Sequence, residues 1–311
     1  MTACFADSTS DVCHTSTPMS KSSSSSSDTT ALTWPAVSSP LEGLEDLYIH
    51  RFVGIVNMRK AVKSQSDKLQ AGDSNQQYLV FRPVTEDDLA KIDRARRSIG
   101  SNTRMAHYID EDLLIVKLMP SAGHEGAHVN FGKKLCSKTI SMGMTDEDLY
   151  GLGSTRFPGR RSSKEGDSAY KPLSRGNRSD WPTIVIESGL SESLRHLRAD
   201  AKWWLENSGG DVGIVILISI KEAQRNLLIE KWELALAPNR PITRAFNNPN
   251  TLIPTKMQEI RIDSNIVVTG APLVLEFRKI FLRPPTPPEN DIVFTVQDLS
   301  AWATQYWAGL G

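Results

Sequence analysis

Two carboxylate residues, Asp167 and Glu187, stand 20 positions apart in the 311-residue sequence. Asp167 lies in a polar and basic stretch, whereas Glu187 ends the short apolar run 184–186. If the chain brings these side chains together, their oxygens could hold a divalent cation, because Mg²⁺ and Mn²⁺ prefer hard oxygen ligands. The alternative is that Asp167 is a turn residue and that Glu187 simply faces solvent.

Basic residues surround Asp167. Between residues 156 and 178, seven Lys or Arg side chains accompany two carboxylates, which leaves an excess of five positive charges in a chain of zero formal net charge. Such a local excess would attract a polyanion such as DNA or RNA, and the competing interpretation is a solvated loop. The basic residues are Arg156, Arg160, Arg161, Lys164, Lys171, Arg175 and Arg178.

The composition limits the class of protein. Lys plus Arg and Asp plus Glu both total 36, so any contact with nucleic acid must be local. The three cysteines, Cys4, Cys13 and Cys136, form neither a disulfide nor a zinc pattern. No apolar run is long enough to cross a membrane, and the first residues lack signal-peptide features. We therefore expect an intracellular protein, in the cytoplasm or nucleus, with no membrane contact.

Four segments have the features of helices. In the first, Thr85 is a suitable N-terminal cap, the three acidic residues that follow it favour the positive end of the helix dipole, and Gly100 stops the helix. The third has an apolar stripe at helical spacing and ends in two glycines. The four ranges are 85–100, 123–143, 191–210 and 295–307.

Runs of apolar and β-branched residues indicate strands. Segment 226–235 alternates and closely follows the apolar run 211–220, so these two are predicted to form a hairpin. Segments 65–77 and 165–180 are predicted to be polar loops. The remaining predicted strands are 113–118, 148–157 and 182–187, with paired strands within 266–282 and an extended linker over 283–290.

This order of elements predicts an α/β fold in which helices flank a mixed β-sheet. Residues 1–40 are rich in Ser and Thr and are predicted to be a disordered tail, because they can bury little apolar area. We expect 41–104 to pack on the core as an N-terminal segment and 105–235 to form the core. Segment 236–311 would add C-terminal strands, a Pro-rich linker and a short helix.

Five stretches between about residues 105 and 235 occur in a characteristic order: MPSAGHEGAH, EGDSAYKP, WPTIVIESGLSES, LRADAKWWL and GIVILISI. Together they resemble the PD-(D/E)XK nuclease superfamily. Within it, they are most similar to the Uma-type restriction-endonuclease-like branch and its fungal relatives. The resemblance implies a restriction-endonuclease-like core.

The resemblance also implies that the protein hydrolyses phosphodiester bonds of DNA or RNA with Mg²⁺ or Mn²⁺. The cation would activate a water molecule and polarise the phosphoryl oxygen. Asp167, Glu187 and the backbone carbonyl of Ser188 would hold it, and Lys202 would stabilise the negative charge that develops during the reaction. The residues expected to bind the substrate are Arg160, Arg161 and Arg198.

The sequence departs from the family pattern in three places. Gly189 stands where the motif has Lys, Gly166 precedes Asp167 where the motif has Pro, and Asp200 and Lys202 are two positions apart where the branch tends to have four. A catalytically degenerate protein that binds nucleic acid or protein is therefore the alternative function. A regulatory interaction protein, with the Ser-rich tail as a phosphorylation segment, is a third.

Two further features suggest chemistry but have a simpler interpretation. His124 and His128 are spaced as two zinc ligands on one helix face would be, but no third ligand is evident, so we expect structural roles. Trp203 and Trp204 are adjacent, and we expect packing rather than base stacking from both.

Overall fold

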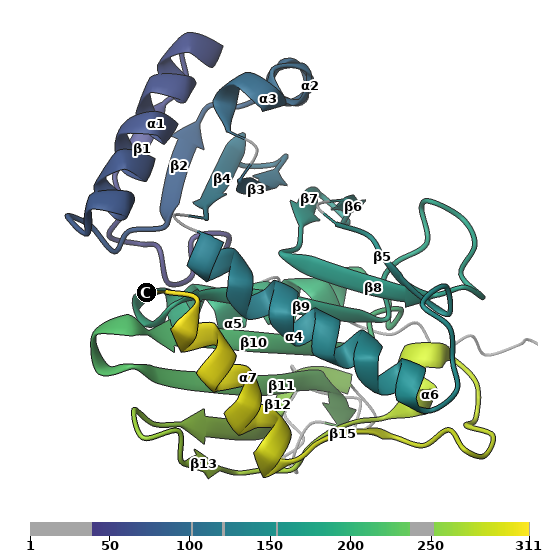
Figure 1. Ribbon diagram of the computed structural model, residues 1–311. Coiled ribbons are helices and arrows are strands. Elements are labelled where there is room, and N and C mark those ends of the chain that lie inside the picture. Colours follow the sequence, from purple (N-terminus) through teal and green to yellow (C-terminus); the bar gives the residue numbers. More distant parts are fainter. Residues whose placement is uncertain (1–38, 101, 120–121, 154, 237–251, 311) are drawn as a thin grey trace, which may run out of the picture. The chain divides into compact units, whose positions relative to one another are not determined.

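The computed structural model describes residues 39–100, 102–119, 122–153, 155–236 and 252–310, which form two large β-sheets and one small sheet. All of them belong to one compact unit, Trp34–Gly311. Helices flank the sheets (Figure 1), so the predicted mixed α/β fold class is confirmed. The predicted disordered tail, 1–40, lies outside the described residues except for its last two positions.

The first sheet has one parallel pair, β1 with β2, and is otherwise antiparallel. Helices α1 (Ile55–Ala71), α2 (Glu86–Arg94) and α3 (Arg96–Ile99) lie over one of its faces (Figure 1). Its strand order is β1 (Ile49–Arg51), β2 (Tyr78–Arg82), β4 (Leu113–Leu118), β3 (Thr103–Tyr108), β7 (Ser162–Glu165) and β6 (Arg156–Pro158).

Strand β4 shows why this sheet has two apolar faces. Side chains alternate along a strand, so Leu114 and Val116 pack with the helices of the first sheet. Leu113 and Ile115 pack on the opposite side with residues of the second sheet. Lys117 continues this second set, and it therefore points toward the second sheet.

The second sheet is antiparallel except for β9 and β10, which are parallel and are connected through helix α5 (Leu194–Asn207). A parallel pair requires such a crossover. The predicted hairpin of 211–220 and 226–235 is confirmed as β10 and β11. The strand order is β13 (Val268–Thr269), β12 (Leu252–Ile262), β11 (Asn226–Leu236), β10 (Ile214–Lys221), β9 (Ile184–Leu190), β8 (Ser168–Pro172) and β5 (Leu149–Gly151).

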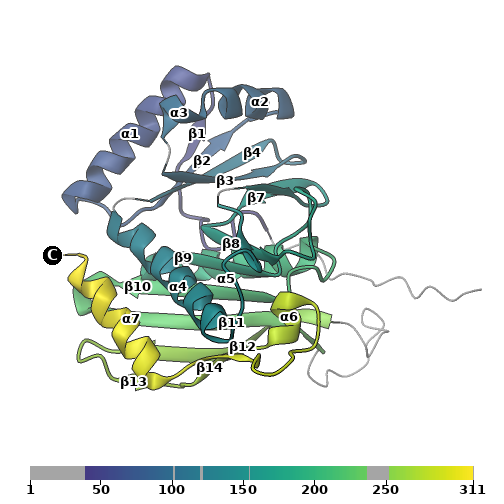
Figure 2. The ribbon, with the colours of Figure 1, turned by 45° about the vertical axis from the view of Figure 1, so that its right-hand side comes forward.

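The two faces of the second sheet have different covers. Helices α4 (Ala122–Ser141) and α7 (Val296–Ala308), which lie side by side in Figures 1 and 2, pack with Ile184 and Ile186 of β9. Helix α5 and the first sheet pack with Val185. Glu187 shares the face of Val185 and is therefore enclosed between the second sheet, α5 and the first sheet. The short helix α6 (Phe277–Phe281) and the small sheet of β14 (Leu273–Leu275) and β15 (Ile292–Phe294) join the α4 side.

Helix boundaries follow the caps in the sequence. The predicted helix over 85–100 is α2 followed by α3, and the Asp88 backbone N–H donates to Thr85 Oγ1 at 3.2 Å. The predicted helices over 123–143, 191–210 and 295–307 correspond to α4, α5 and α7. Thr295 and Asp298 form a capping box at the start of α7.

Several local predictions differ from the structure. The polar segment 65–77 is not all loop, because α1 continues to Ala71 and ends where Gly72 adopts a left-handed conformation. The segment 165–180 contains β8, because the neighbouring β9 provides hydrogen-bond partners for a strand of low hydrophobicity. The predicted strand over 148–157 splits into β5 and β6 of different sheets. Segment 266–282 contains the strands β13 and β14, but they pair with β12 and β15 and not with each other, and α6 follows them.

In the part of the chain that the structure describes, no helix has the length and apolar character needed to cross a membrane. The predicted intracellular location stays a prediction. The predicted division at residues 104/105 and 235/236 also stays a prediction, although β3 spans the first boundary and β2 pairs with β4 across it.

Two glycines of α4 offer a matched test of how this helix packs on β8. A Cβ added at Gly132 would lie 1.9 Å from the Tyr170 hydroxyl oxygen, whereas a Cβ at Gly126 would approach only the Asn130 side chain, at 3.8 Å. We expect Gly132→Ala to lower the free energy of unfolding by about 1–3 kcal/mol through overpacking. Gly126→Ala should raise it by up to about 1 kcal/mol through helix propensity. Urea unfolding followed by circular dichroism measures both, and equal effects would contradict the described packing.

Candidate functional site

The strand register brings Asp167 and Glu187 together. Strands β8 and β9 are antiparallel neighbours in which Ser168 pairs with Ile186. Continuing this register by one position places Asp167 opposite Glu187, and side chains that are opposite in an antiparallel pair lie close together. Asp167 also has a fixed backbone, because Arg104 of β3 donates from Nε to the Gly166 carbonyl at 3.1 Å.

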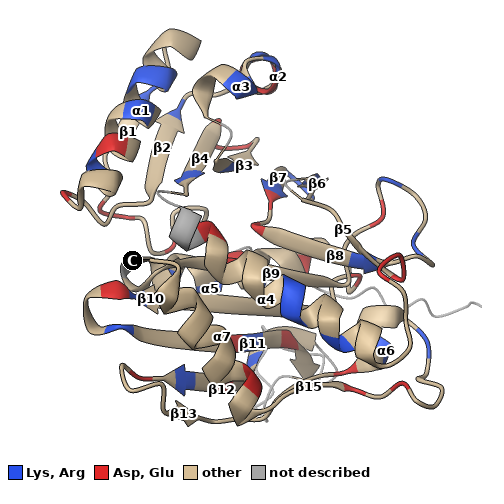
Figure 3. Cartoon of the chain, in the orientation of Figure 1, with Lys and Arg blue, Asp and Glu red and all other residues tan. Residues whose placement is uncertain are grey.

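A lysine from the first sheet joins the two carboxylates. Lys117 Nζ donates to Asp167 Oδ2 at 2.7 Å and to Glu187 Oε2 at 3.2 Å. The two carboxylate oxygens therefore lie no farther apart than the sum of these distances. The Ser188 backbone N–H also donates to Asp167 Oδ2, at 2.7 Å. Figure 3 shows Lys or Arg near the end of β4 and an acidic residue at the start of β8.

A second lysine extends this network to helix α5. Lys164 of β7 donates to Asp200 Oδ1 at 2.7 Å and lies 3.8 Å from Glu187 Oε1. That same Glu187 oxygen accepts a hydrogen bond from Trp204 Nε1 at 2.8 Å. Asp200 is also 3.5 Å from His196 Nε2, one helical turn earlier. We call Lys117, Lys164, Asp167, Glu187 and Asp200 the charge network.

The charge network is closed to solvent and sits between the two sheets. None of its five side chains is more than 7% exposed. Burial of ionised groups is costly unless each is paired, and here two ammonium groups meet three carboxylates. Each lysine contacts two carboxyl groups, and the network has three acidic groups to two basic ones.

The two aspartates stay ionised and the lysines stay protonated. Burial works against the charged form of Asp167, but the Lys117 ammonium outweighs it and holds the Asp167 pKa well below its usual range. Burial likewise opposes ionisation of Asp200, but Lys164 lowers the pKa of Asp200. Against the opposing effect of burial, Asp167 raises the pKa of Lys117 and Asp200 raises that of Lys164.

Glu187 behaves differently from its neighbours. Burial raises the pKa of this carboxyl group, and the attraction of Lys164 and Lys117 does not fully offset burial. Glu187 is therefore the network member that takes up a proton most readily. Two carboxylates with opposite pKa shifts beside a shared amine are a combination that acid–base chemistry can use.

Unpaired polar atoms lie next to this network. Asp167 Oδ1, Asp200 Oδ2 and His128 Nε2 are buried without a hydrogen-bond partner among the described residues. His128 of α4 contacts Ser168 Oγ through Nδ1 at 2.7 Å. His128 therefore approaches the start of β8 with its second ring nitrogen free. The side chain of His124 lies outside the described part of the chain.

The other sequence-predicted site residues contact different partners. Lys202 Nζ donates to Glu42 at 3.0 Å, and Arg198 pairs with Glu230 of β11. The Arg160 and Arg161 side chains are exposed. Arg161 pairs with Asp110 at 2.6 Å, and the Arg160 backbone N–H donates to Asn207 Oδ1. The structure thus brings together Asp167, Glu187 and Ser188 and places the remaining four elsewhere.

The two glycines that depart from the family pattern have packing reasons. A Cβ at Gly189 would lie 2.8 Å from Ser193 Oγ and 3.1 Å from Gln77 Oε1, which accepts the Leu190 backbone N–H at 2.7 Å. A Cβ at Gly166 would lie 3.2 Å from the Trp204 ring. A lysine therefore does not fit at position 189 without displacing its neighbours, and the amine beside the carboxylates comes from Lys117 instead.

Sequence reasoning did not assign Lys117 or Lys164 to the site. The sequence around Lys117 does indicate a buried charge, because this lysine interrupts the apolar strand LLIVKL. Every residue of that strand is buried. A charged residue inside such a strand requires an opposite charge nearby. The sequence around Lys164 does not distinguish this lysine from its neighbours, because several other basic residues lie close to it.

No family model matches the chain, and no curated protein matches it. Among solved structures, the chain is similar to a protein from Anabaena variabilis described as a "putative nuclease belonging to DUF820". The identity is 14%, the TM-score is 0.35, and the alignment covers 64% of this chain and 90% of that one. The family resemblance therefore stays a prediction.

Removing the amine tests whether the charge network stabilises the fold. Lys117→Met would leave two buried carboxylates without their shared ammonium, and we expect it to lower the free energy of unfolding by about 3–5 kcal/mol. Lys202→Met is the matched control, because the Lys202–Glu42 pair is 30% and 24% exposed. It should change stability by less than about 1 kcal/mol. Equal losses in urea unfolding would show that Lys117 contributes no more than a partly exposed ion pair.

The pH dependence of stability tests the surroundings of His128. Burial lowers the pKa of His128 from its ordinary 6.5 to about 4. The unfolded state therefore binds more protons between these values, and stability is lost as the pH falls from about 6.5 to about 4. This group alone should contribute up to about 3 kcal/mol over that window. We expect His128→Asn to remove this part of the slope, and parallel stability–pH profiles for the two proteins would contradict the assignment.

Proposed function

We propose that this protein hydrolyses phosphodiester bonds in DNA or RNA, with Mg²⁺ or Mn²⁺ held at Asp167 and Glu187. One observation supports the proposal above the others. Two carboxylates from neighbouring strands of the second sheet share a buried amine, and carboxylates that hold a divalent cation beside a charge-stabilising group are what metal-dependent phosphodiester cleavage uses. The resemblance of the sequence around these residues to the PD-(D/E)XK superfamily points to the same chemistry.

The donor set fits a hard divalent cation. Asp167 Oδ1 is a buried carboxylate oxygen without a partner, so it is available as a ligand. Among the described residues, no group of three or more His, Cys, Asp or Glu side chains could hold a metal ion. Mg²⁺ does not require such a group, because it is usually bound by one or two carboxylates and keeps several water molecules. In the proposal, Asp167, Glu187 and the Ser188 carbonyl hold it.

The bound cation would supply a more acidic water and a positive charge beside the phosphoryl group. Lys117 takes the part that the resemblance assigned to Lys202, because its ammonium already contacts both carboxylates. From this position it can donate to a phosphoryl oxygen that gains negative charge. Trp204 and Lys164 fix Glu187, and this holds the orientation of the two acids.

A second function is favoured by the closure of the site. Lys117 contacts both carboxylates and none of the network side chains is more than 7% exposed, so the network already balances most of its own charge. In that case the chain is a catalytically degenerate relative. The network would join the two sheets, and binding of nucleic acid or protein would use other surfaces.

A cleavage assay with matched carboxamide variants tests the proposal. Plasmid and single-stranded substrates are incubated with Mn²⁺ and the full chain, and Asp167→Asn is expected to lower the rate by about 100-fold or more. Asp110→Asn is the control, since this exposed carboxylate pairs with Arg161 outside the charge network, and its rate should match the wild type. Activity that survives in Asp167→Asn would remove the assigned site.

Calorimetric titration with Mn²⁺ separates the two functions. Heat of binding that is lost in Asp167→Asn, together with cleavage, supports catalysis. Absence of both in a wild-type protein that melts cooperatively supports the degenerate alternative. Glu187→Gln provides a second variant if Asp167→Asn does not fold.

A further inference from the structure

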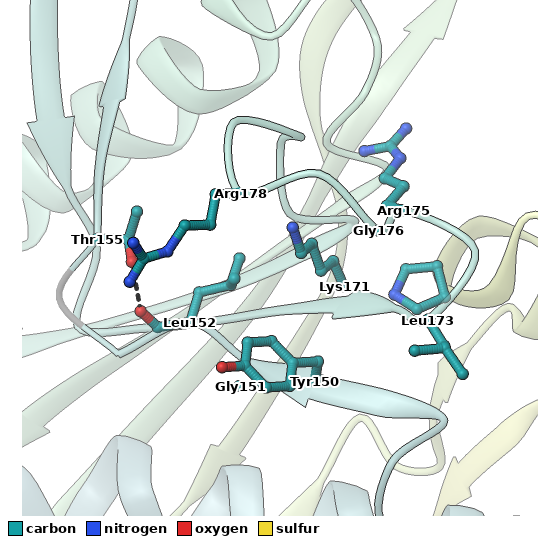
Figure 4. A pocket seen from close by; sticks show the side chains of 10 residues that line it. Tyr150, Gly151, Leu152, Thr155, Lys171, Leu173, Arg175, Gly176 and Arg178 are labelled. Carbon is teal, nitrogen blue, oxygen red and sulfur yellow. Dashed lines mark hydrogen bonds between the residues drawn. The ribbon is translucent and has the colours of Figure 1, made fainter.

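A pocket on the edge of the second sheet is lined by positive charge and lies apart from the charge network. Its volume is about 580 Å³, within the usual range for small-molecule sites. It is formed by β5, β8 and the loop after β8, and Figure 4 shows the Lys171, Arg175 and Arg178 side chains around it. None of the residues that line the pocket is acidic.

Lys171 is the feature of this pocket that most needs a partner. The residue is only 5% exposed. Its Nζ donates to the Asn177 carbonyl at 2.5 Å, and no carboxylate among the described residues forms an ion pair with it. Buried ammonium groups are normally neutralised by an acid, so an anion in the pocket would supply the missing charge.

The two arginines have different roles. Arg175 is held in place, because it donates to the Trp181 carbonyl at 2.7 Å and to Asp211 Oδ1 at 2.8 Å. Arg178 is exposed and has no ion-pair or hydrogen-bond partner among the residues that the structure describes. Lys171 and Arg178 are therefore the two cations whose charge remains available to a ligand.

An aromatic ring completes the lining. Tyr150 of β5 is directly opposite Lys171 in the β5–β8 register and is 59% exposed. Thr155 is fixed nearby, because its hydroxyl donates to the Leu152 carbonyl at 2.6 Å (Figure 4). An exposed tyrosine beside uncompensated cations suits a ligand that has both a flat ring and an anionic group.

We propose that this pocket binds a nucleotide, with the phosphate at Lys171 and Arg178 and the base against Tyr150. The same chemistry is offered by a free nucleotide and by one unit of a single strand. Lys171 lies four residues along the strand from Asp167, which is about 13 Å at about 3.3 Å per residue. The pocket is thus a separate site, and its ligand does not depend on cleavage at the carboxylates.

Binding measurements on the full chain test the site. The probes are a fluorescein-labelled 12-nucleotide oligo-deoxythymidine, adenosine monophosphate and inorganic phosphate. We expect Arg178→Gln and Lys171→Met each to weaken nucleotide binding by about tenfold or more, since a charged hydrogen bond is lost. Arg59→Gln is the matched control, because Arg59 is an exposed arginine of α1 outside the pocket, and it should bind as the wild type does.

The comparison of probes identifies the ligand. Tyr150→Leu should weaken both nucleotide probes and leave phosphate binding unchanged. Binding of adenosine monophosphate that depends on the pocket residues indicates a free nucleotide, and pocket-dependent binding of the oligonucleotide alone indicates a strand. No binding of either nucleotide probe, or equal binding by wild type and Arg178→Gln, overturns the proposal. Binding is measured without added divalent cation and without cleavage, so a failure of the hydrolytic proposal leaves this outcome unaffected.

Discussion

The contact of Lys117 with Asp167 and Glu187 is the interaction on which the arrangement of the two sheets depends. Three ionisable side chains, from β4, from β9 and from the residue just before β8, are removed from water together. Each would be strongly unfavourable there without the others. The apolar cores on either side bring the strands close, but they do not specify one alignment. The charge network specifies the alignment, because a shift of β4 by one residue would turn Lys117 toward the helices of the first sheet.

Local sequence signals predicted individual helices and strands better than they predicted which strands pair with each other. Thr85 and Thr295 lie at helix starts whose hydrogen bonds involve neighbouring residues, so the sequence alone was sufficient there. Strand β4 was predicted with its observed boundaries because its apolar run is uninterrupted apart from Lys117. Strand β8 was missed, because a polar strand acquires its stability from β9 and from contacts such as His128 with Ser168.

The acids of the candidate site were predictable, whereas the amine was not. Asp167 and Glu187 lie close in sequence and on neighbouring strands, so a short connection is enough to bring them together. Lys117 reaches them across 50 and 70 residues, and such a contact depends on how the sheets pack. Lys202 and Arg198 were predicted to belong to the site, but they lie elsewhere. A basic helix face identifies charge but not its partner, and these residues pair with Glu42 and Glu230.

The crowding around Gly189 has a consequence for how this protein can be divided. Because a side chain at position 189 would collide with Ser193 and Gln77, that position cannot supply a lysine, and the positive groups beside Glu187 come from the first sheet. The segment that carries the two acids is thus not a transferable module. Its minimal independent form has to include the sheet that begins at β1, and any relative without that sheet must obtain its amine from another direction.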